Sequence, residues 1–208
     1  MILTLGDSFT WGDELADRTA EAWPYLIAQQ FDHSVVNLAE PGASNDFIVR
    51  LGVEQTIKQQ YDLVVVAWAD QNRLEVWSEV DRQIKSINSN STFMPWIQDY
   101  YRHSYNDEYN LEKKSLQMLL LQQHFKQINQ PYLFTNVSGR HFCYRKYFEK
   151  FSYIWKQYDL ANLMGWYDGG LVEWAGDAPR GDRGHPLTLG HKRIAEKIAM
   201  YIQMYNKL

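Results

Sequence analysis

The chain has 208 residues, and its 45% hydrophobic and 22% charged content is ordinary for a globular protein, so we expect one domain spanning residues 1–208. The net charge of −4 argues against a nucleic-acid binder that neutralises phosphates, and the single cysteine, Cys143, excludes an intrachain disulfide or a cysteine-rich zinc site. No apolar run approaches the roughly 20 residues of a membrane helix, and no basic segment followed by an apolar one opens the chain. These features predict a cytoplasmic protein.

Short apolar runs bounded by turn residues are the predicted strands. Branched and apolar side chains dominate them, and Pro131 opens the fourth, at a position where proline is tolerated. A further run at 171–174 is the candidate for a fifth strand. The first four runs lie at residues 2–5, 34–38, 63–68 and 132–137.

Segments with helical periodicity separate these strands. In residues 111–128, apolar side chains recur at spacings of three and four residues, which predicts a helix. Other predicted helices begin near Thr19, with Pro24 in the first turn, after the turn at 42–44, and after Thr188. Strands that alternate with helices predict an α/β fold with a mostly parallel sheet covered on both faces.

Two segments do not fit a minimal α/β unit. Residues 88–110 are polar and aromatic, and residues 140–167 are rich in tyrosine, tryptophan and phenylalanine. We predict that both are insertions that form a cap beside the strand ends. The aromatic side chains of the second segment could serve core packing or a subunit contact, or they could wall a site for a sugar or an acyl group.

Polar segments follow three of the predicted strands, and another precedes the last helix. Because sites in open α/β sheets lie at the carboxyl ends of the strands, we expect these segments to converge on one edge. They are Ser8, Pro41-Gly42-Ala43-Ser44-Asn45, Asp70-Gln71-Asn72-Arg73 and Asp182-Arg183-Gly184-His185.

The residue types in these segments suit nucleophilic acyl transfer. A serine hydroxyl such as that of Ser8 needs a base to take its proton, and His185 is the candidate base. An imidazole in turn needs a carboxylate that fixes its tautomer, and Asp182 lies three residues away in the same loop. The sequence therefore predicts a Ser8–His185–Asp182 catalytic triad.

Three motifs in this order resemble the SGNH (GDSL-type) hydrolases: Gly6-Asp7-Ser8-Phe9-Thr10-x-Gly12, the late Asp182-x-x-His185-Pro186, and Gly190-His191 opening the last helix. The resemblance implies a flavodoxin-like three-layer α/β/α sandwich with a mostly parallel five-stranded sheet. It also implies esterase or acylhydrolase activity without a metal or an organic cofactor. The backbone N–H groups of Ser8 and Gly42 would be two donors of the oxyanion hole.

The third oxyanion donor of that family is an asparagine side chain in a Gly-x-Asn-Asp block, and here the sequence departs from the pattern. An ungapped alignment places Ala69 on the glycine, Gln71 on the asparagine and Asn72 on the aspartate. Either Asn72 or Gln71 is therefore a candidate donor, and the shorter amide of Asn72 is favoured because it is better preorganised.

Other polar residues near the motifs have structural explanations. Asp7 is expected to bond backbone groups of its turn, and His191 lies inside the predicted last helix. Arg73 is expected either to start a helix or to contact substrate, and Cys143 to be an inert small residue.

Asp177 is a substitute candidate for Asp182, although it stands eight residues from His185 and no motif supports it. A metal hydrolase is an alternative that would use Asp177, Asp182, His185 and His191. The spacing of these residues matches no zinc motif, so no metal is predicted.

We therefore predict a serine esterase or acylhydrolase that cleaves a short-chain carboxylic ester through an acyl-enzyme. The expected partner is a small-molecule or glycan ester, an acylated carbohydrate first, and no nucleic acid; the oligomeric state stays open. The alternative is a catalytically weak or inactive module of the same fold that binds a glycan or a partner protein. The presence of Ser8, His185 and Asp182 together argues against that alternative.

Overall fold

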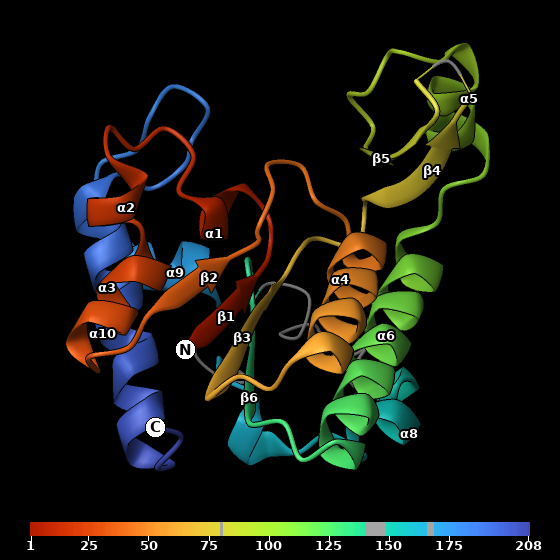
Figure 1. Cartoon of the computed structure of the whole chain (residues 1–208). Coiled ribbons are helices and arrows are strands. Elements are labelled where there is room, and N and C mark those ends of the chain that lie inside the picture. Colours follow the sequence, from red (N-terminus) through yellow and green to blue (C-terminus); the bar gives the residue numbers. More distant parts are fainter. Residues whose placement is uncertain (80, 140–148, 166–168) are drawn as a thin grey trace.

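The computed structural model describes residues 1–79, 81–139, 149–165 and 169–208. At its centre lies a parallel sheet whose strands are β1 (Ile2–Leu5), β2 (Val35–Asn37), β3 (Leu63–Trp68) and β6 (Tyr132–Asn136), in the order β2-β1-β3-β6 (Figure 1). Every residue of β1 and β3 is buried, which explains why both read as continuous apolar runs. The strand order is that of flavodoxin-like folds.

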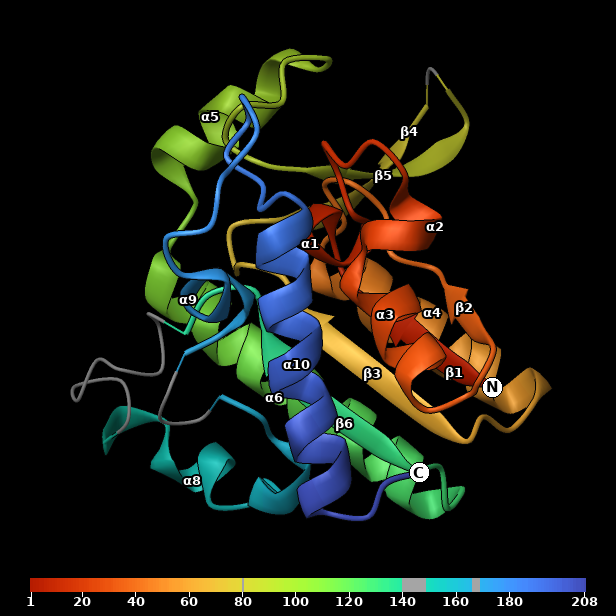
Figure 2. The same cartoon turned by 90° about the vertical axis from the view of Figure 1, so that its left-hand side faces the viewer.

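Helices cover both faces of the sheet, as predicted. They are α3 (Trp23–Gln30), α9 (Leu171–Ala175) and α10 (Thr188–Met204) on one face, and α4 (Asn45–Lys58), α6 (Asp107–Gln127) and α8 (Ser152–Trp155) on the other. Alternate residues of β3 enter opposite cores: Val64 and Val66 pack with α4 and α6, whereas Val65 and Ala67 pack with α3 and α10. Figures 1 and 2 show the resulting three-layer α/β/α sandwich.

The predicted fifth strand at 171–174 is wrong, because these residues form helix α9. Leu171 and Ala175, one helical turn apart, both enter the same core, and the Glu173 carboxylate accepts a hydrogen bond from the Gly170 N–H at 2.7 Å. Beyond β6, the described residues contribute a single parallel bridge between Phe134 and Leu163. Within the described chain the parallel sheet thus has four strands and not five.

Two short helices connect the end of β1 to α3. They are α1 (Ser8–Trp11) and α2 (Arg18–Glu21). Thr19, predicted to cap the helix at Pro24, lies instead inside α2, whose N-cap is Asp17. The helix predicted to begin after the turn at 42–44 is confirmed as α4. The Ser44 hydroxyl caps it by accepting the Phe47 N–H at 3.2 Å.

A projecting arm, residues 74–103, leaves the sandwich after β3. It consists of the antiparallel strands β4 (Leu74–Ser78) and β5 (Gln83–Ile87), followed by α5 (Pro95–His103). The arm stands beyond the carboxyl end of the parallel sheet in both views (Figures 1 and 2). The predicted insertion at 88–110 therefore began too late and ended too late, since α6 already begins at Asp107.

The aromatic segment predicted at 140–167 lies partly outside the described residues. In its described part, α8 and a 3₁₀ turn (Leu160–Asn162) follow one another, and Phe151, Trp155 and Tyr158 are buried. The Trp155 Nε1–H donates to Ser115 Oγ at 3.2 Å and the Tyr158 hydroxyl donates to the Ser115 carbonyl at 2.8 Å. These three rings therefore serve core packing against α6.

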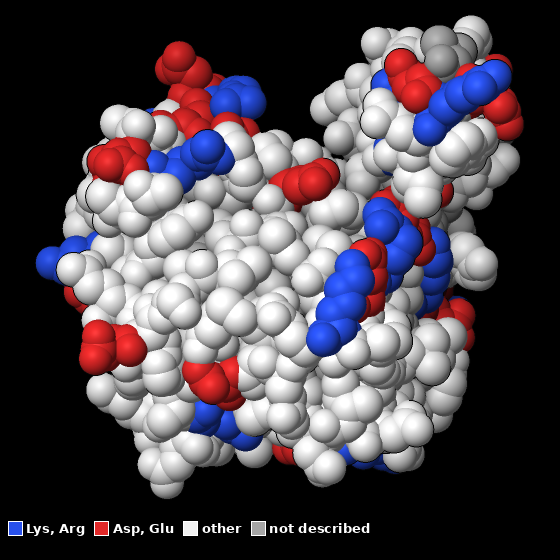
Figure 3. Space-filling view, in the orientation of Figure 1, with Lys and Arg blue, Asp and Glu red and all other residues white. Residues whose placement is uncertain are grey.

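Charges of both signs alternate along the exposed side of α4 (Figure 3). The ion pairs Arg50–Glu75 and Lys58–Glu54 belong to this surface, so the positive groups there are already matched by carboxylates. Among the described residues, no helix combines the length and apolarity needed to cross a membrane.

Candidate active site

A tight corner carries Ser8 from the end of β1 into α1. The Asp7 Oδ1 accepts the Phe9 N–H at 3.0 Å and so caps this single helical turn. A Cβ at Gly6 would lie 2.2 Å from the Thr10 Oγ1, so only glycine allows the corner to close this tightly. The corner places Ser8, 5% exposed, at the carboxyl end of a central strand.

The loop that precedes α10 brings His185 to this serine. The His185 Nε2 lies 2.8 Å from the Ser8 Oγ, although 177 residues separate the two in sequence. The Phe9 ring packs against the imidazole, with 5.1 Å between ring centroids. Ser8 and His185 therefore meet in the geometry of a nucleophile and its base.

Glu14, and not Asp182, is the carboxylate that contacts this imidazole. The Glu14 Oε2 lies 2.8 Å from the His185 Nδ1 and also accepts the His185 backbone N–H at 3.1 Å. The Glu14 Oε1 accepts the Arg183 N–H at 2.9 Å. These hydrogen bonds, the one from Arg183 foremost, lower the pKa of Glu14 to about 2, so its side chain is ionised at neutral pH.

The path of the last loop explains why Asp182 is not the partner. The loop turns back on itself through the Gly184 N–H to Gly181 carbonyl bond, which aims the backbone N–H groups of residues 183 and 185 at Glu14. Asp182 is exposed and makes no hydrogen bond or ion pair with the described residues. A Cβ at Gly181 would lie 2.4 Å from the Glu14 Oε1, so this glycine leaves the space that the Glu14 carboxylate fills.

Glu14 adopts a left-handed backbone conformation, with φ of +68°. Such a conformation costs a non-glycine residue about 1–2 kcal/mol, and here the hydrogen bonds to the last loop hold it. The neighbouring Asp13 forms an ion pair with Arg183 at 2.7 Å and lies 4.0 Å from the His185 Nδ1. Glu14 is absent from the sequence-based prediction, although two adjacent acidic residues so soon after the serine corner were an available signal.

Of the two backbone N–H groups expected in the oxyanion hole, that of Ser8 lies at the corner and that of Gly42 lies in the loop after β2. Neither the Ser8 N–H nor the Gly42 N–H is hydrogen-bonded to any part of the chain that the structure describes. Gly42 has φ of +82°, which favours glycine, and the Glu40 N–H donates to the Gly6 carbonyl at 3.2 Å. This bond ties the Gly42 loop to the corner that bears Ser8.

The two amides at the end of β3 differ in their surroundings. The Gln71 Nε2 donates to the Asp107 Oδ1 at 3.5 Å, and its side chain is buried. The Asn72 carbonyl accepts the Tyr101 hydroxyl of the arm at 2.7 Å, whereas the Asn72 side chain has no hydrogen bond within the described ranges. Within the described residues, the Gln71 amide thus has a hydrogen-bond partner and the Asn72 side chain has none.

A sequence profile for a family of unknown function, DUF6071, matches residues 12–208. The chain belongs to this family. The matched range includes both Glu14 and His185, while Ser8 lies just before it. No curated protein sequence matches this DUF6071 chain significantly.

Solved structures resemble this DUF6071 protein over nearly its whole length. One is a G-D-S-L family protein from Desulfitobacterium hafniense DCB-2, with 11% identity, a TM-score of 0.60 and coverage of 96% of this chain and 98% of that one. Another is the psychrotrophic esterase EstA from Pseudoalteromonas sp., with 14% identity, a TM-score of 0.60 and coverage of 100% and 98% of the two chains. A third is the acetylxylan esterase Axe2 from Geobacillus stearothermophilus, with 18% identity, a TM-score of 0.53 and coverage of 97% and 93%. At these identities the likeness concerns the fold, which is that of the SGNH hydrolases.

Other residues singled out from the DUF6071 sequence lie apart from the Ser8–His185 pair. Asp177 is exposed and pairs with Arg193 at 2.7 Å, and His191 is fully buried in α10, where its Nδ1 accepts the Trp23 N–H at 3.2 Å. Burial lowers the pKa of His191 to about 4. Across the described ranges, no three histidine, cysteine, aspartate or glutamate side chains are grouped to hold a metal. Cys143 lies outside the described residues.

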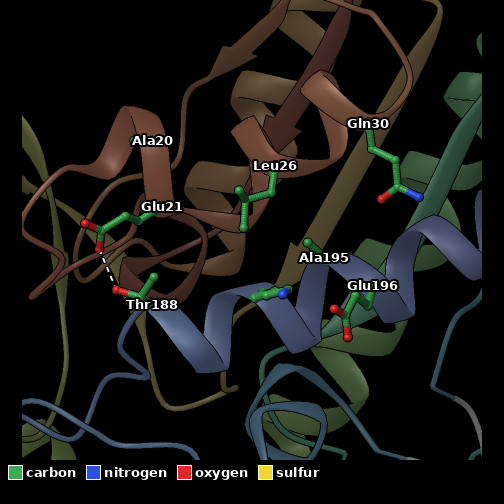
Figure 4. Close-up of a pocket in the computed structure, with 8 residues that line it drawn as sticks. Ala20, Glu21, Leu26, Gln30, Thr188, Ala195 and Glu196 are labelled. Atoms are coloured by element: carbon green, nitrogen blue, oxygen red, sulfur yellow. Dashed lines mark hydrogen bonds between the residues drawn. The ribbon is translucent and has the colours of Figure 1, made fainter.

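A surface pocket of about 290 Å³ lies between α3 and α10 of the DUF6071 fold (Figure 4). The Thr188 hydroxyl donates to the Glu21 Oε2 at 2.7 Å beside it, and Leu26 and Ala195 supply apolar lining. Neither Ser8 nor His185 lines this pocket, so it is separate from the candidate active site.

Proposed function

We propose that this protein is a serine esterase that cleaves a carboxylic ester through an acyl-enzyme. One observation carries the proposal: the Ser8 Oγ, the two imidazole nitrogens of His185 and the Glu14 Oε2 form a continuous series, with 2.8 Å at each of its two hydrogen bonds. A buried serine could cap a helix without such partners, but a serine–imidazole–carboxylate series is the arrangement that activates a nucleophile.

In the first half of the proposed reaction, the Ser8 Oγ attacks the ester carbonyl carbon and its proton passes to the His185 Nε2. Glu14 holds the Nδ1–H tautomer and stabilises the imidazolium that forms. The tetrahedral intermediate then expels the alcohol, which takes the proton from Nε2. Ser8 is left acylated.

In the second half, His185 takes a proton from water, and the resulting hydroxide attacks the acyl carbonyl. Collapse of this second intermediate breaks the bond to the Ser8 Oγ, which recovers its proton from Nε2, and releases the carboxylic acid. In both halves the negative charge on the carbonyl oxygen would be met by the N–H groups of Ser8 and Gly42 and by the Asn72 amide. One such donor is typically worth about 10²–10³ in rate.

An ester of a short acyl group with a carbohydrate is the proposed substrate class. It is supported by the likeness to Axe2, an acetylxylan esterase whose fold this chain shares at 97% coverage. The rings of Phe151, Trp155 and Tyr158 do not support a sugar-binding wall, because they are buried against α6.

The proposal predicts that the purified protein hydrolyses p-nitrophenyl acetate and that a fluorophosphonate labels Ser8, as mapped by mass spectrometry. Ser8→Ala should lose the labelling and reduce kcat by about 10⁴-fold or more, because the nucleophile is gone. Ser91→Ala, which alters a serine of the arm, is the matched control and should retain both properties.

Equal turnover by the wild type and Ser8→Ala would refute Ser8 as the nucleophile. Absence of both turnover and labelling in a folded wild-type protein would instead favour a module of this fold that binds a glycan or a partner protein.

A further inference from the structure

Arg73 bridges the two loops that carry the backbone donors of the candidate active site. Its Nη1 donates to the Asp7 Oδ2 at 2.7 Å and to the Ala43 carbonyl at 3.2 Å. Asp7 immediately precedes Ser8, and Ala43 immediately follows Gly42. One guanidinium nitrogen therefore donates to a residue next to each proposed oxyanion donor: to the Asp7 side chain beside Ser8 and to the Ala43 carbonyl beside Gly42.

The contact with Asp7 is largely removed from water. The Asp7 side chain is 1% exposed and that of Arg73 is 19% exposed. Burial raises the pKa of Asp7, and the positive charge of Arg73 is the strongest influence in the opposite direction. Removing one partner of such a pair leaves an uncompensated buried charge, or a neutralised group that holds its neighbour less firmly.

A second buried cation lies behind this pair. Lys114 of α6 is 2% exposed, and burial lowers its pKa to about 8, against the attraction of the Asp70 and Asp7 carboxylates. Two cations and two carboxylates thus lie close enough to influence one another's pKa values. Of these, Arg73 is hydrogen-bonded both to the Ser8 loop, through Asp7, and to the Gly42 loop, through Ala43.

We propose that Arg73 is a positioning residue that sets the spacing between the Ser8 and Gly42 N–H donors. The inference rests on the proposed esterase function. The two donors belong to different loops, one after β1 and one after β2, and an oxyanion hole stabilises the transition state only if its donors are held at the right spacing before reaction. A small relative displacement of the loops would leave substrate binding intact and weaken the interaction with the developing oxyanion.

The test compares Arg73→Met and Arg73→Lys with Arg50→Met, which breaks the ion pair between Arg50 of α4 and Glu75 of β4. We expect Arg73→Met to lower kcat for p-nitrophenyl acetate by about 10²-fold while KM changes by less than about threefold. Arg73→Lys keeps the charge but has no planar fork, and it should recover part of kcat. Arg50→Met should match the wild type.

A second readout separates positioning from folding. The rate of fluorophosphonate labelling at Ser8 should fall in parallel with kcat in Arg73→Met, measured well below its thermal midpoint. The double variant Asp7→Asn/Arg73→Met should lose less than the product of the single losses, because Arg73 acts partly through Asp7.

Two results would overturn the inference. One is an Arg73→Met protein with wild-type kcat and labelling rate, and the other is a loss that appears only as a raised KM. Either leaves the esterase proposal intact as long as the wild type is labelled at Ser8. A folded wild type without labelling or turnover would refute the esterase proposal, and the role of Arg73 with it.

Discussion

The loop from Ser8 to Glu14 and the loop from Gly181 to Leu187 come from opposite ends of the chain and meet at the imidazole of His185. The first loop supplies both the hydroxyl and the carboxylate of the proposed triad. The last loop supplies the imidazole, together with two backbone N–H groups that hold the carboxylate in place.

This division shows that proximity in sequence is a poor guide to which acid orients an imidazole. Asp182 is three residues from His185 but exposed, while Glu14 is 171 residues away and in contact with the imidazole. The last loop acts on Glu14 chiefly through its backbone. Its side chains at 182 and 183 are exposed, although Arg183 reaches Asp13.

The largest difference in activity between variants of the two loops should come from their acidic residues, Glu14 and Asp182. Glu14→Gln should lower kcat/KM by about 10³–10⁴-fold, because the glutamine N–H can face Nδ1 and stabilise the tautomer whose Nε2 bears a proton and cannot accept one from Ser8. Asp182→Asn is the matched control and should stay within about twofold, as expected for an exposed side chain without partners among the described residues. Steady-state kinetics on p-nitrophenyl acetate measure both.

The low pKa of Glu14 limits its part in the pH dependence of the activity. Because the pKa of Glu14 is about 2, Glu14 stays ionised down to about pH 3, so its protonation should not reduce the activity of the wild type above that pH. If Asp182→Asn lost as much activity as Glu14→Gln, the assignment of the acid to the first loop would fail.

Much of the fold follows from the sequence because its signals are local. β1 and β3 have the predicted bounds, since a buried central strand must be a continuous apolar run flanked by turn residues. The position of Ser8 also follows from a general rule, because the loop after a central parallel strand lies at the edge where sites form. The His185 loop reaches the same edge differently, since it joins helices α9 and α10.

The errors arise where tertiary contacts decide. The run at 171–174 is too short to distinguish strand from helix by pattern, and the hydrogen bond from Gly170 to Glu173 favours the helix. The role of Glu14 depends on a positive φ and on the fold of a loop far away in sequence. Neither can be read from residue types.

An intermediate effect should distinguish the two amides that follow β3. Asn72→Ala should lower kcat by about 10²–10³-fold, because a side-chain donor to the oxyanion is lost. Gln71→Ala is the control, and its loss in kcat should be at least about tenfold smaller, since the Gln71 amide already donates to Asp107. Equal losses of kcat would mean that Gln71 can donate to the oxyanion despite its contact with Asp107. If neither variant lost kcat, the backbone N–H donors would be sufficient.

The smallest effect concerns the anchor of the last loop and appears in stability. His191, six residues after His185, ties α10 to the start of α3 through the Trp23 N–H. Burial lowers its pKa to about 4, against 6.5 for a histidine in water, so the folded protein holds this imidazole neutral while the unfolded chain protonates it. The contribution to stability is therefore complete above about pH 6.5 and is lost as the pH falls toward 4, by roughly 3 kcal/mol in total.

Urea unfolding of the wild type and of His191→Asn at several pH values between 7 and 4 measures this loss. The asparagine Oδ1 can still accept the Trp23 N–H but does not titrate, so the free energy of unfolding of the variant should fall less steeply with acid. His103→Asn, which changes an exposed histidine on α5, is the control and should follow the wild type. If His191→Asn and the wild type lose stability in parallel, the fold does not hold the imidazole of His191 neutral, and the link between α10 and α3 does not weaken with acid as proposed.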